Sequence, residues 1–295
     1  MLKRKKLSVS RIFIHFILSL FSLFCLIPML LVLSTSLTDE KYLRVNGISL
    51  IPGKFSLYAY QYILSDPGQM IRSYAISILI TVVGTFLSLW FTSSLAYVIC
   101  RKDYAYANAT SLIIFITMLF GVGLTPQYLI MVNVLHLKNN LMALILPNLI
   151  GGFNVMLLKG YMQGIPASVF ESAKMDGARE WRIYFSIALP VAVPGLATVS
   201  LFNVFVYWND WQNAMLYMDD FRNAPLQLLL QRILMNIEYI LKVMSPSVSK
   251  DFISNLPSMG ARMALCLVAT GPILFVFLLF QKYLISGLVV GSVKG

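Results

Sequence analysis

The chain has 295 residues, of which 58% are hydrophobic and only 12% are charged, and its formal net charge is +11. Soluble domains usually carry about 25% charged residues, so this composition excludes an ordinary soluble protein and favours a membrane protein. The basic excess does not indicate nucleic-acid binding, because no RNA- or DNA-binding pattern accompanies it. Basic residues on the cytoplasmic loops of a membrane protein explain it more simply.

Six stretches are long and apolar enough to cross about 30 Å of hydrocarbon, which takes about 20 helical residues. They cover residues 12–33, 73–100, 109–132, 141–158, 187–208 and 259–283. The first follows a basic tail at residues 1–11. Its apolar run is too long for a signal peptide, and no small-residue cleavage site follows it. The sequence therefore predicts an all-α integral membrane protein with six transmembrane helices, the first of them retained.

The loops between these stretches differ in basic content, and this difference sets the orientation. If the N-terminus is cytoplasmic, the inner segments hold more than half of the lysines and arginines. These segments nevertheless contain fewer loop residues than the outer segments do. We therefore expect both termini in the cytoplasm, with a C-terminal tail at residues 285–295. The outer side then receives two long segments, residues 34–71 and 209–258. The second contains LQLLLQRILMNIEYILKVM, which is typical of an amphipathic helix near the membrane surface.

The polar residues offer no catalytic group. The two histidines, His15 and His136, lie on different segments, and no common hydrolase or metalloprotease motif occurs. GISLIPGKF at Gly47–Phe55 fails as an ATP-binding loop, because Phe55 stands where a magnesium-binding hydroxyl is needed. We expect no catalytic site, metal or cofactor in this chain. The spans also carry no charged residue near mid-depth, which argues against an ion-coupled carrier.

One compact group of charges interrupts the apolar sequence, ESAKMDGAREWRIYFSIALP at Glu171–Pro190. Pro166 suits the first turn of a helix, and the sequence SVFE that begins at Ser168 fits a capping box. Gly177 can take the left-handed conformation that ends this helix, and a second helix would begin around Ala178 and run towards the final proline. A plain amphipathic connector between two spans is the alternative explanation.

The segment resembles the EAA motif of inner-membrane permeases of ABC importers, written E-A-A-x-x-x-G with a trailing L-P. The matching residues are Glu171, Ala173, Gly177, Leu189 and Pro190, with Ser172 in place of the first alanine. The M-D-G-A form, YWNDWQNAMLYM at Tyr207–Met218 and the ending QKYLISGLVVGSVKG resemble the maltose-type, carbohydrate-uptake branch. The resemblance covers the chain from about Arg72 to Gly295.

This resemblance implies a type I ABC importer permease fold over residues 72–284, with a cytoplasmic EAA coupling loop at residues 161–186, in a prokaryotic plasma membrane. It implies a second, homologous permease in a heterodimer, two ATPase subunits that bind the ATP and magnesium, and an extracellular binding protein that delivers a carbohydrate, with an oligosaccharide as the first expectation. The resemblance also implies which residues couple this chain to the ATPase: Glu171, Ser172, Ala173, Asp176, Gly177, Ala178, Leu189 and Pro190.

The outer end of the fifth span, NVFVYWNDWQN, brings aromatic rings beside amides and a carboxylate. Sugars present C–H faces and hydroxyls, and such a mixture suits both. We expect solute-path or binding-protein contacts among Asn203, Tyr207, Trp208, Asn209, Asp210 and Trp211. A membrane-interface aromatic belt is the alternative. For the whole chain, the other classes are a secondary carrier or channel for small polar solutes and an integral-membrane enzyme.

Overall fold

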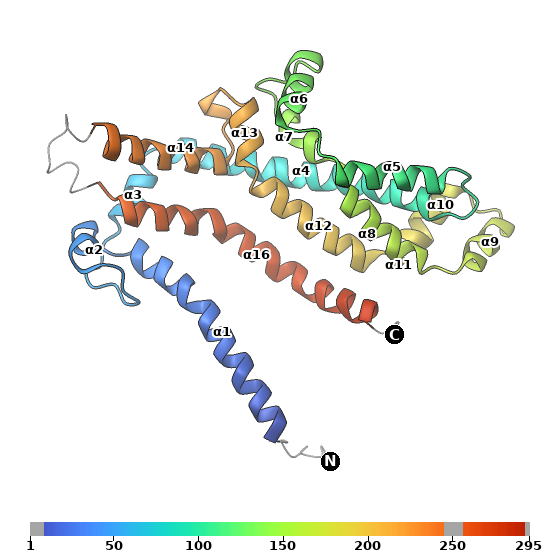
Figure 1. The fold of residues 1–295 in the computed structure, drawn as a ribbon, viewed down its shortest axis with the longest axis horizontal. Helices are drawn as coiled ribbons and strands as arrows, with labels where there is room; N and C mark the ends of the chain where they lie inside the picture. The colour runs from blue at the N-terminus through green and yellow to red at the C-terminus, as the bar shows by residue number, and fades with distance from the viewer. Residues whose placement is uncertain (1–8, 245–255, 293–295) are drawn as a thin grey trace. The chain divides into compact units, whose positions relative to one another are not determined.

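The computed structural model describes residues 9–244 and 256–292, and every regular element in these two ranges is helical (Figure 1). The chain divides into two compact units, Met1–Pro67 with Arg232–Gly271, and Gly68–Gln231 with Pro272–Gly295. Most of the expected basic tail, residues 245–255 of the expected outer loop and the last three residues of the C-terminal tail lie outside the described residues. The prediction of an all-α protein is confirmed for the described ranges.

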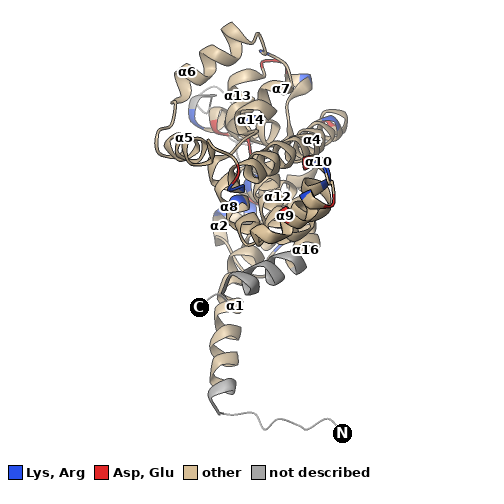
Figure 2. Ribbon diagram, turned by 90° about the vertical axis from the view of Figure 1, so that its right-hand side faces the viewer, with Lys and Arg blue, Asp and Glu red and all other residues tan. Residues whose placement is uncertain are grey.

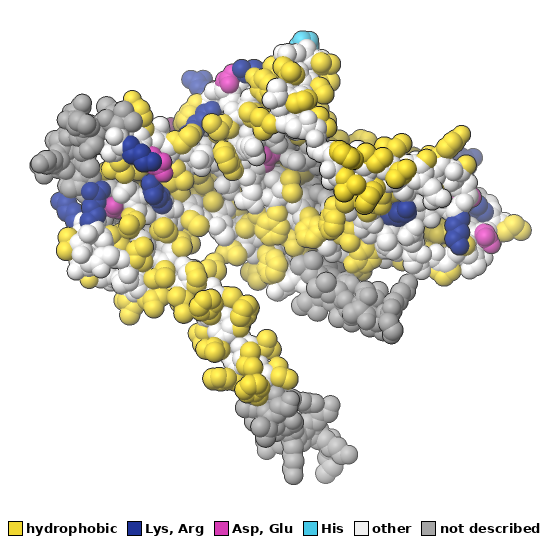
Figure 3. All heavy atoms as spheres, in the orientation of Figure 1, with side chains coloured by type: hydrophobic (Ala, Val, Ile, Leu, Met, Phe, Trp, Pro, Cys, Tyr) yellow, Lys and Arg dark blue, Asp and Glu magenta, His cyan; other side chains and the backbone are white. Residues whose placement is uncertain are grey.

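The first unit contains α1 (Val9–Ser36), α2 (Glu40–Asn46), α3 (Tyr58–Ile63) and the first part of α16 (Ser258–Ser292). Side chains along α1 are apolar and exposed, as the yellow surface of this helix in Figure 3 shows. Phe24, for example, is 72% exposed. A helix that is apolar on all sides needs an apolar surrounding, which lipid supplies.

Glu40 joins the first and last long helices inside this unit. Its buried carboxylate accepts hydrogen bonds from Ser258 Oγ at 2.8 Å and from the backbone amide of Gly260 at 3.1 Å. These donors belong to the first turn of α16, where free amides and the helix dipole favour a negative charge. At the end of α1, Ser36 Oγ lies 2.9 Å from the hydroxyl of Tyr60 on α3. The segment after α1 thus holds the start of α16 in place.

The second unit is built around α4 (Pro67–Cys100), a single unbroken helix. Three other expected spans are bent pairs of helices. They are α5 (Ala107–Leu119) with α6 (Leu124–Leu129) and η1 (Ile130–Val134), bent by 110°; α7 (Met142–Ile145) and η2 (Leu146–Asn148) with α8 (Gly152–Gln163), bent by 54°; and α10 (Glu180–Ile183), η3 (Tyr184–Ala188) and α11 (Leu189–Val191) with α12 (Val193–Trp208), bent by 80°. By length and composition alone, the described residues offer three single helices that could cross a membrane, or up to six spans if each bent pair is one.

Glycine and proline account for the three bends. Gly123 has φ +80° between α5 and α6, and Pro126 follows in the first turn of α6. Pro147 lies in η2, and Pro190 and Pro194 flank the bend between α11 and α12. Proline removes an amide donor and clashes with the carbonyl of the preceding turn, so a helix bends or ends beside it.

The segment after α12 completes the second unit and leads into the first. It contains α13 (Trp211–Tyr217), η4 (Phe221–Asn223), α14 (Leu226–Tyr239) and η5 (Ile240–Met244). The expected amphipathic helix is present as α14. Its first turns bury Leu226, Leu228, Leu229 and Leu230. The sequence therefore placed this helix correctly, while its depth relative to a membrane stays a prediction.

Gly84 permits close contact between α4 and α12, and this generates a test of the packing. A Cβ atom at Gly84 would lie 2.7 Å from Cζ of the buried Tyr207 ring. We expect Gly84→Ala to lower the free energy of unfolding by about 1–3 kcal/mol, the usual cost of overpacking. Gly160→Ala is the matched control on α8, because nothing lies within 4 Å of a Cβ atom there. Thermal unfolding of the detergent-purified chain measures both, and equal stabilities would contradict this packing.

Candidate functional site: the EAA loop

The EAA loop (residues 161–186) folds as two helices that meet at a left-handed glycine. After α9 (Ala167–Met175), Gly177 has φ +76°. Its amide donates to the carbonyl of Lys174, and the amide of Ala178 donates to the carbonyl of Ala173, both at 3.0 Å. These two bonds form a Schellman motif, which satisfies the last carbonyls of a helix. The prediction that Gly177 ends the first helix in the left-handed conformation is confirmed.

Two details of the expected loop are wrong. Pro166 occupies the N-cap of α9, and no side chain caps this helix, so the expected capping box from Ser168 does not form. Since the helix begins at Ala167, Ser168 is already inside its first turn and cannot act as the cap. The second helix, α10, begins at Glu180 rather than near Ala178, because Ala178 is engaged in the Schellman motif.

The motif residues divide between two faces. Five of them are exposed, Glu171, Ser172, Asp176, Gly177 and Pro190, whereas Ala173, Ala178 and Leu189 are half-buried against the hydrophobic core of the second unit. Glu171 makes no hydrogen bond or ion pair within the described part of the chain. The small half-buried residues let the loop lie close to the spans, and the polar ones remain available to a partner.

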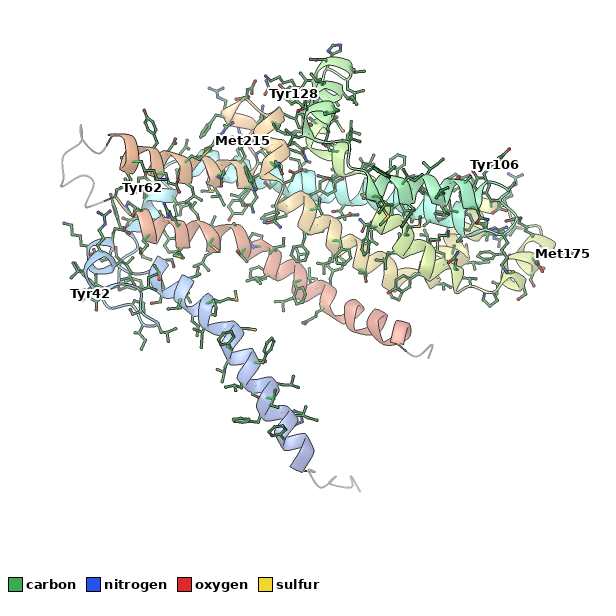
Figure 4. The ribbon with its side chains drawn as sticks, in the orientation of Figure 1. Tyr42, Tyr62, Tyr106, Tyr128, Met175 and Met215 are labelled. Atoms are coloured by element: carbon green, nitrogen blue, oxygen red, sulfur yellow. The ribbon has the colours of Figure 1, made fainter. Side chains whose placement is uncertain are left out.

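Large apolar side chains project from the same exposed face. Met175 is 87% exposed at the end of α9, where Figure 4 shows it pointing away from the molecule. Trp181 is 63% exposed, and its ring stacks on Phe185 with a centroid distance of 6.1 Å. A hollow of about 240 Å³ in the same loop is lined partly by Asp176 and Arg182. Exposed apolar side chains are typical of a protein-docking surface.

A cluster of charged and aromatic side chains, here called the Arg101 cluster, connects the EAA loop to α4 and to the residues that follow α4. It consists of Tyr97, Arg101, Asp103, Lys174 and Glu180. The Arg101 side chain is only 8% exposed. It donates two hydrogen bonds to Asp103, at 2.9 and 2.7 Å, and its guanidinium carbon lies 4.6 Å from the centre of the Phe170 ring on α9. Bidentate pairing and stacking on a ring are both suited to arginine.

The second half of the Arg101 cluster joins both loop helices. Lys174 Nζ lies 2.6 Å from Asp103 and 3.0 Å from Glu180, and the Tyr97 hydroxyl donates to Glu180 at 2.6 Å. Figure 2 shows these charges gathered beside α9 and α10, whereas α5 carries none. From the sequence alone, the charged residues of this cluster indicate only the orientation of the loops. The sequence RKD directly after α4 was the available signal, but their partners lie about 80 residues away.

The cluster shifts the pKa values of its carboxylates. Hydrogen bonds from Arg101 and then Lys174 hold the pKa of Asp103 well below its usual range. Burial alone would raise the pKa of Glu180, but hydrogen bonds from Tyr97 and Lys174 outweigh it and leave that pKa below its ordinary value. Both carboxylates therefore stay ionised, and the ion pairs persist, at and well below neutral pH.

The six residues expected to meet the solute fall into two groups. Asn203, Tyr207 and Trp208 are buried inside the second unit. Asn203 donates to Ser88 Oγ on α4 and accepts from Asn154 on α8, both at 2.9 Å. These amide contacts link three helices within apolar surroundings, where an unpaired amide would be costly. The sequence analysis did not identify Asn154 as their partner.

Tyr207 satisfies a backbone group that a bend releases. In the 3-10 turn of η2 the amide of Leu149 donates to Leu146 rather than to Ile145. The carbonyl of Ile145 instead accepts the Tyr207 hydroxyl at 3.0 Å. Buried carbonyls need such partners, so Tyr207 supports the bend between α7 and α8.

The remaining three residues lie just beyond α12. Asp210 caps α13 through the amide of Asn213 at 3.0 Å and also accepts from Asn148 at 2.9 Å. Burial raises the pKa of Asp210, and these bonds oppose the rise. Asn209 and Trp211 are exposed. Of the six, only these two are exposed, and the Asn209 side-chain amide donates to the carbonyl of Phe205 at 2.9 Å.

The fold and the loop define a class: an all-helical membrane protein in the described ranges, with an exposed loop of two short helices. The family model of the inner membrane component of binding-protein-dependent transport systems matches residues 104–290, and the chain belongs to this family.

Named relatives agree with this assignment. The polygalacturonan/rhamnogalacturonan transport system permease protein YtcP of Bacillus subtilis is 37% identical over 96% of this chain and 97% of its own. The arabinooligosaccharides transport system permease protein AraQ of Halalkalibacterium halodurans is 28% identical over 91% of each chain. A solved bacterial ABC transporter involved in the import of the acidic polysaccharide alginate is similar with a TM-score of 0.77 and 28% identity, over 95% of this chain and 99% of that one.

The low pKa of Asp103 predicts how acid affects the loop. A lowered pKa contributes stability that is fully present above the ordinary value of 3.8 and is lost as pH falls through the lowered value. A nitroxide label on Met175→Cys, in a background without the native cysteines, should therefore show unchanged mobility from pH 7 down to about 4 and greater mobility only below it. Asp103→Asn should raise the mobility at neutral pH, and Lys102→Gln should not. A wild-type transition between pH 5 and 6 would contradict the cluster.

Proposed function

We propose that this chain is one permease subunit of an ATP-driven importer and forms half of the path for a carbohydrate. Six spans would leave both termini in the cytoplasm of a prokaryotic cell. A second, homologous permease would complete the path, two ATPase subunits would dock beneath it, and an extracellular binding protein would deliver the solute. The similarity to a polygalacturonan/rhamnogalacturonan permease, to an arabinooligosaccharide permease and to an alginate importer supports the carbohydrate.

The exposed face of the EAA loop carries the proposal. A carrier or channel working alone has no need for a loop whose two helices expose Met175 and Trp181 while Ala173 and Ala178 pack against the core. Glu171 on the first of these helices has no partner among the described residues. An apolar anchor surrounded by polar groups is the usual composition of a binding hot spot. We therefore assign this face to the ATPase, with Ala173, Ala178 and Leu189 transmitting its movement into the core.

We further propose that Asn209 and Trp211 contact the solute or the docked binding protein, because both are exposed beside α13. Asn203, Tyr207, Trp208 and Asp210 would act on the same path indirectly. Their hydrogen bonds and packing hold α12 and α13 where the exposed pair can face a partner.

The proposed orientation can be measured by labelling. Ile51 is 79% exposed in the segment after α1, and Ser172 is exposed on the EAA loop. In a background without the native cysteines, Ile51→Cys should react with a membrane-impermeant maleimide in intact cells, and Ser172→Cys should react only after the membrane is opened. The reverse pattern would show that the proposed orientation is wrong.

The docking face predicts the result of an uptake experiment. The chain, its partner permease, the ATPase and the binding protein are reconstituted in vesicles, and uptake of labelled oligogalacturonide, arabinooligosaccharide and alginate oligosaccharide is compared with that of an amino acid. We expect ATP-dependent uptake of a saccharide only. Met175→Asp should lower it by about 10-fold or more, since an interface anchor contributes about 2 kcal/mol or more.

Met175→Leu is the matched control, because it keeps an apolar side chain of similar size at the same exposed position. It should retain uptake, and both variants should insert and purify at wild-type yield. Normal uptake by Met175→Asp would show that the EAA loop is only a connector. Uptake of the amino acid alone would overturn the carbohydrate assignment.

A further inference from the structure

The helix α4 differs from the other expected spans of the second unit in being continuous. Its 34 residues correspond to about 50 Å at 1.5 Å per residue. The chain segments that leave the EAA loop in either direction, α8 and α11, reach bends of 54° and 80° before their spans end. A displacement passed to these helices therefore meets a joint, whereas α4 can move as one rigid rod.

The C-terminal end of α4 is fixed to the EAA loop by several side-chain contacts. Besides the bond from Tyr97 to Glu180, Ser93 Oγ lies 2.7 Å from the hydroxyl of Tyr184 on η3. Arg101, directly after the helix, is held between Asp103 and the Phe170 ring of α9. Both halves of the loop thus contact α4 or the residues that continue it.

The N-terminal end of α4 is fixed to the segment that follows α13. Gln69 Nε2 donates to the carbonyl of Phe221 at 2.8 Å, and Ser73 Oγ donates to the carbonyl of Ala224 at 2.7 Å. Ser77 Oγ accepts from the amide of Leu226 at 2.8 Å, which satisfies a free amide at the start of α14. Ser73 and Ser77 are buried, so water does not compete for these bonds.

We infer that α4 transmits movement of the EAA loop to the segment 221–226 at its other end. Arg101 is a positioning residue for this step: it binds neither solute nor nucleotide, and it holds Asp103 under α9 so that the loop and α4 move together. Ser73 and Ser77 fix the far end. The inference rests on the proposed function, since it requires an ATPase that moves the loop. Contiguous packed elements with hydrogen-bonded ends are the physical means by which such coupling travels.

The experiment uses the assembled transporter in vesicles, with a nitroxide on Arg222→Cys, an exposed position in the segment 221–226. In the otherwise wild-type protein, ATP should change the spectrum of this label. Arg101→Gln, Tyr97→Phe and Ser73→Ala should each diminish this change while the ATPase stays bound. The amount of solute imported per ATP hydrolysed should fall by about 2-fold to 30-fold.

Three comparisons separate transmission from loss of structure. Lys102→Gln removes a positive charge next to Arg101 but touches none of the described partners, so it should behave as wild type. Arg101→Lys keeps the charge and should restore part of the ATP-induced change. Tyr97→Phe combined with Ser73→Ala should be no worse than the stronger single variant, because both interrupt one path in series.

An ATP-induced change at residue 222 that persists in both Arg101→Gln and Tyr97→Phe, with normal import per ATP, would overturn the inference. Fully additive effects of Tyr97→Phe and Ser73→Ala would also overturn it. Failure of the proposed function would give a different result. The wild-type chain would then neither retain an ATPase nor show any ATP-induced change, and the inference would be wrong as well.

Discussion

Every backbone amide and carbonyl in a hydrocarbon surrounding must find a partner inside the protein, and the rest of this structure depends on that constraint. It explains why every regular element in the two described ranges is helical. It also explains the side chains at the bends, because each bend releases backbone groups. The Tyr207 hydroxyl binds the carbonyl of Ile145 at the bend between α7 and α8. At a helix start, where free amides also occur, Ser77 accepts the first amide of α14. Some of the buried hydroxyls in the described residues, Tyr207 and Ser77 among them, therefore support the backbone.

The need for a partner inside the protein applies equally to a buried charge, as Arg101 shows at the edge of the apolar region. Arg101 is nearly as buried as a core residue, yet it is paired with carboxylates that remain half exposed. An arginine buried alone would be strongly destabilising, whereas an arginine with a bidentate partner and an aromatic ring beneath it fixes the positions of all three. This arrangement gives the EAA loop one rigid side and leaves its other side free.

The sequence was informative about features that depend on residues close together in the chain. Apolar length predicted apolar helical segments, three of which the structure breaks. The single residue Gly177 predicted the left-handed turn, because few other residues adopt positive φ at low cost. The bends were harder, since Pro28 and Pro272 lie inside continuous helices while Pro147 and Pro194 accompany breaks. The residues around each proline do not decide between these outcomes, because the packing around it involves segments elsewhere in the chain. The Arg101 cluster and the Glu40 contact escaped notice for the same reason, as their partners are remote in sequence.

The Glu40 contact has a consequence for the synthesis of the chain. Its partners begin at Ser258, 218 residues later. At a translation rate of about 5–20 residues per second, Glu40 waits for about 10–40 s before the first turn of α16 leaves the ribosome. The second unit can assemble most of its contacts in that interval, because residues 68–231 are contiguous. The first unit can close only when synthesis is nearly complete. During biogenesis the helix α1 must therefore be retained by lipid or by the insertion machinery, and a nascent chain truncated before Ser258 would leave a carboxylate without its helix.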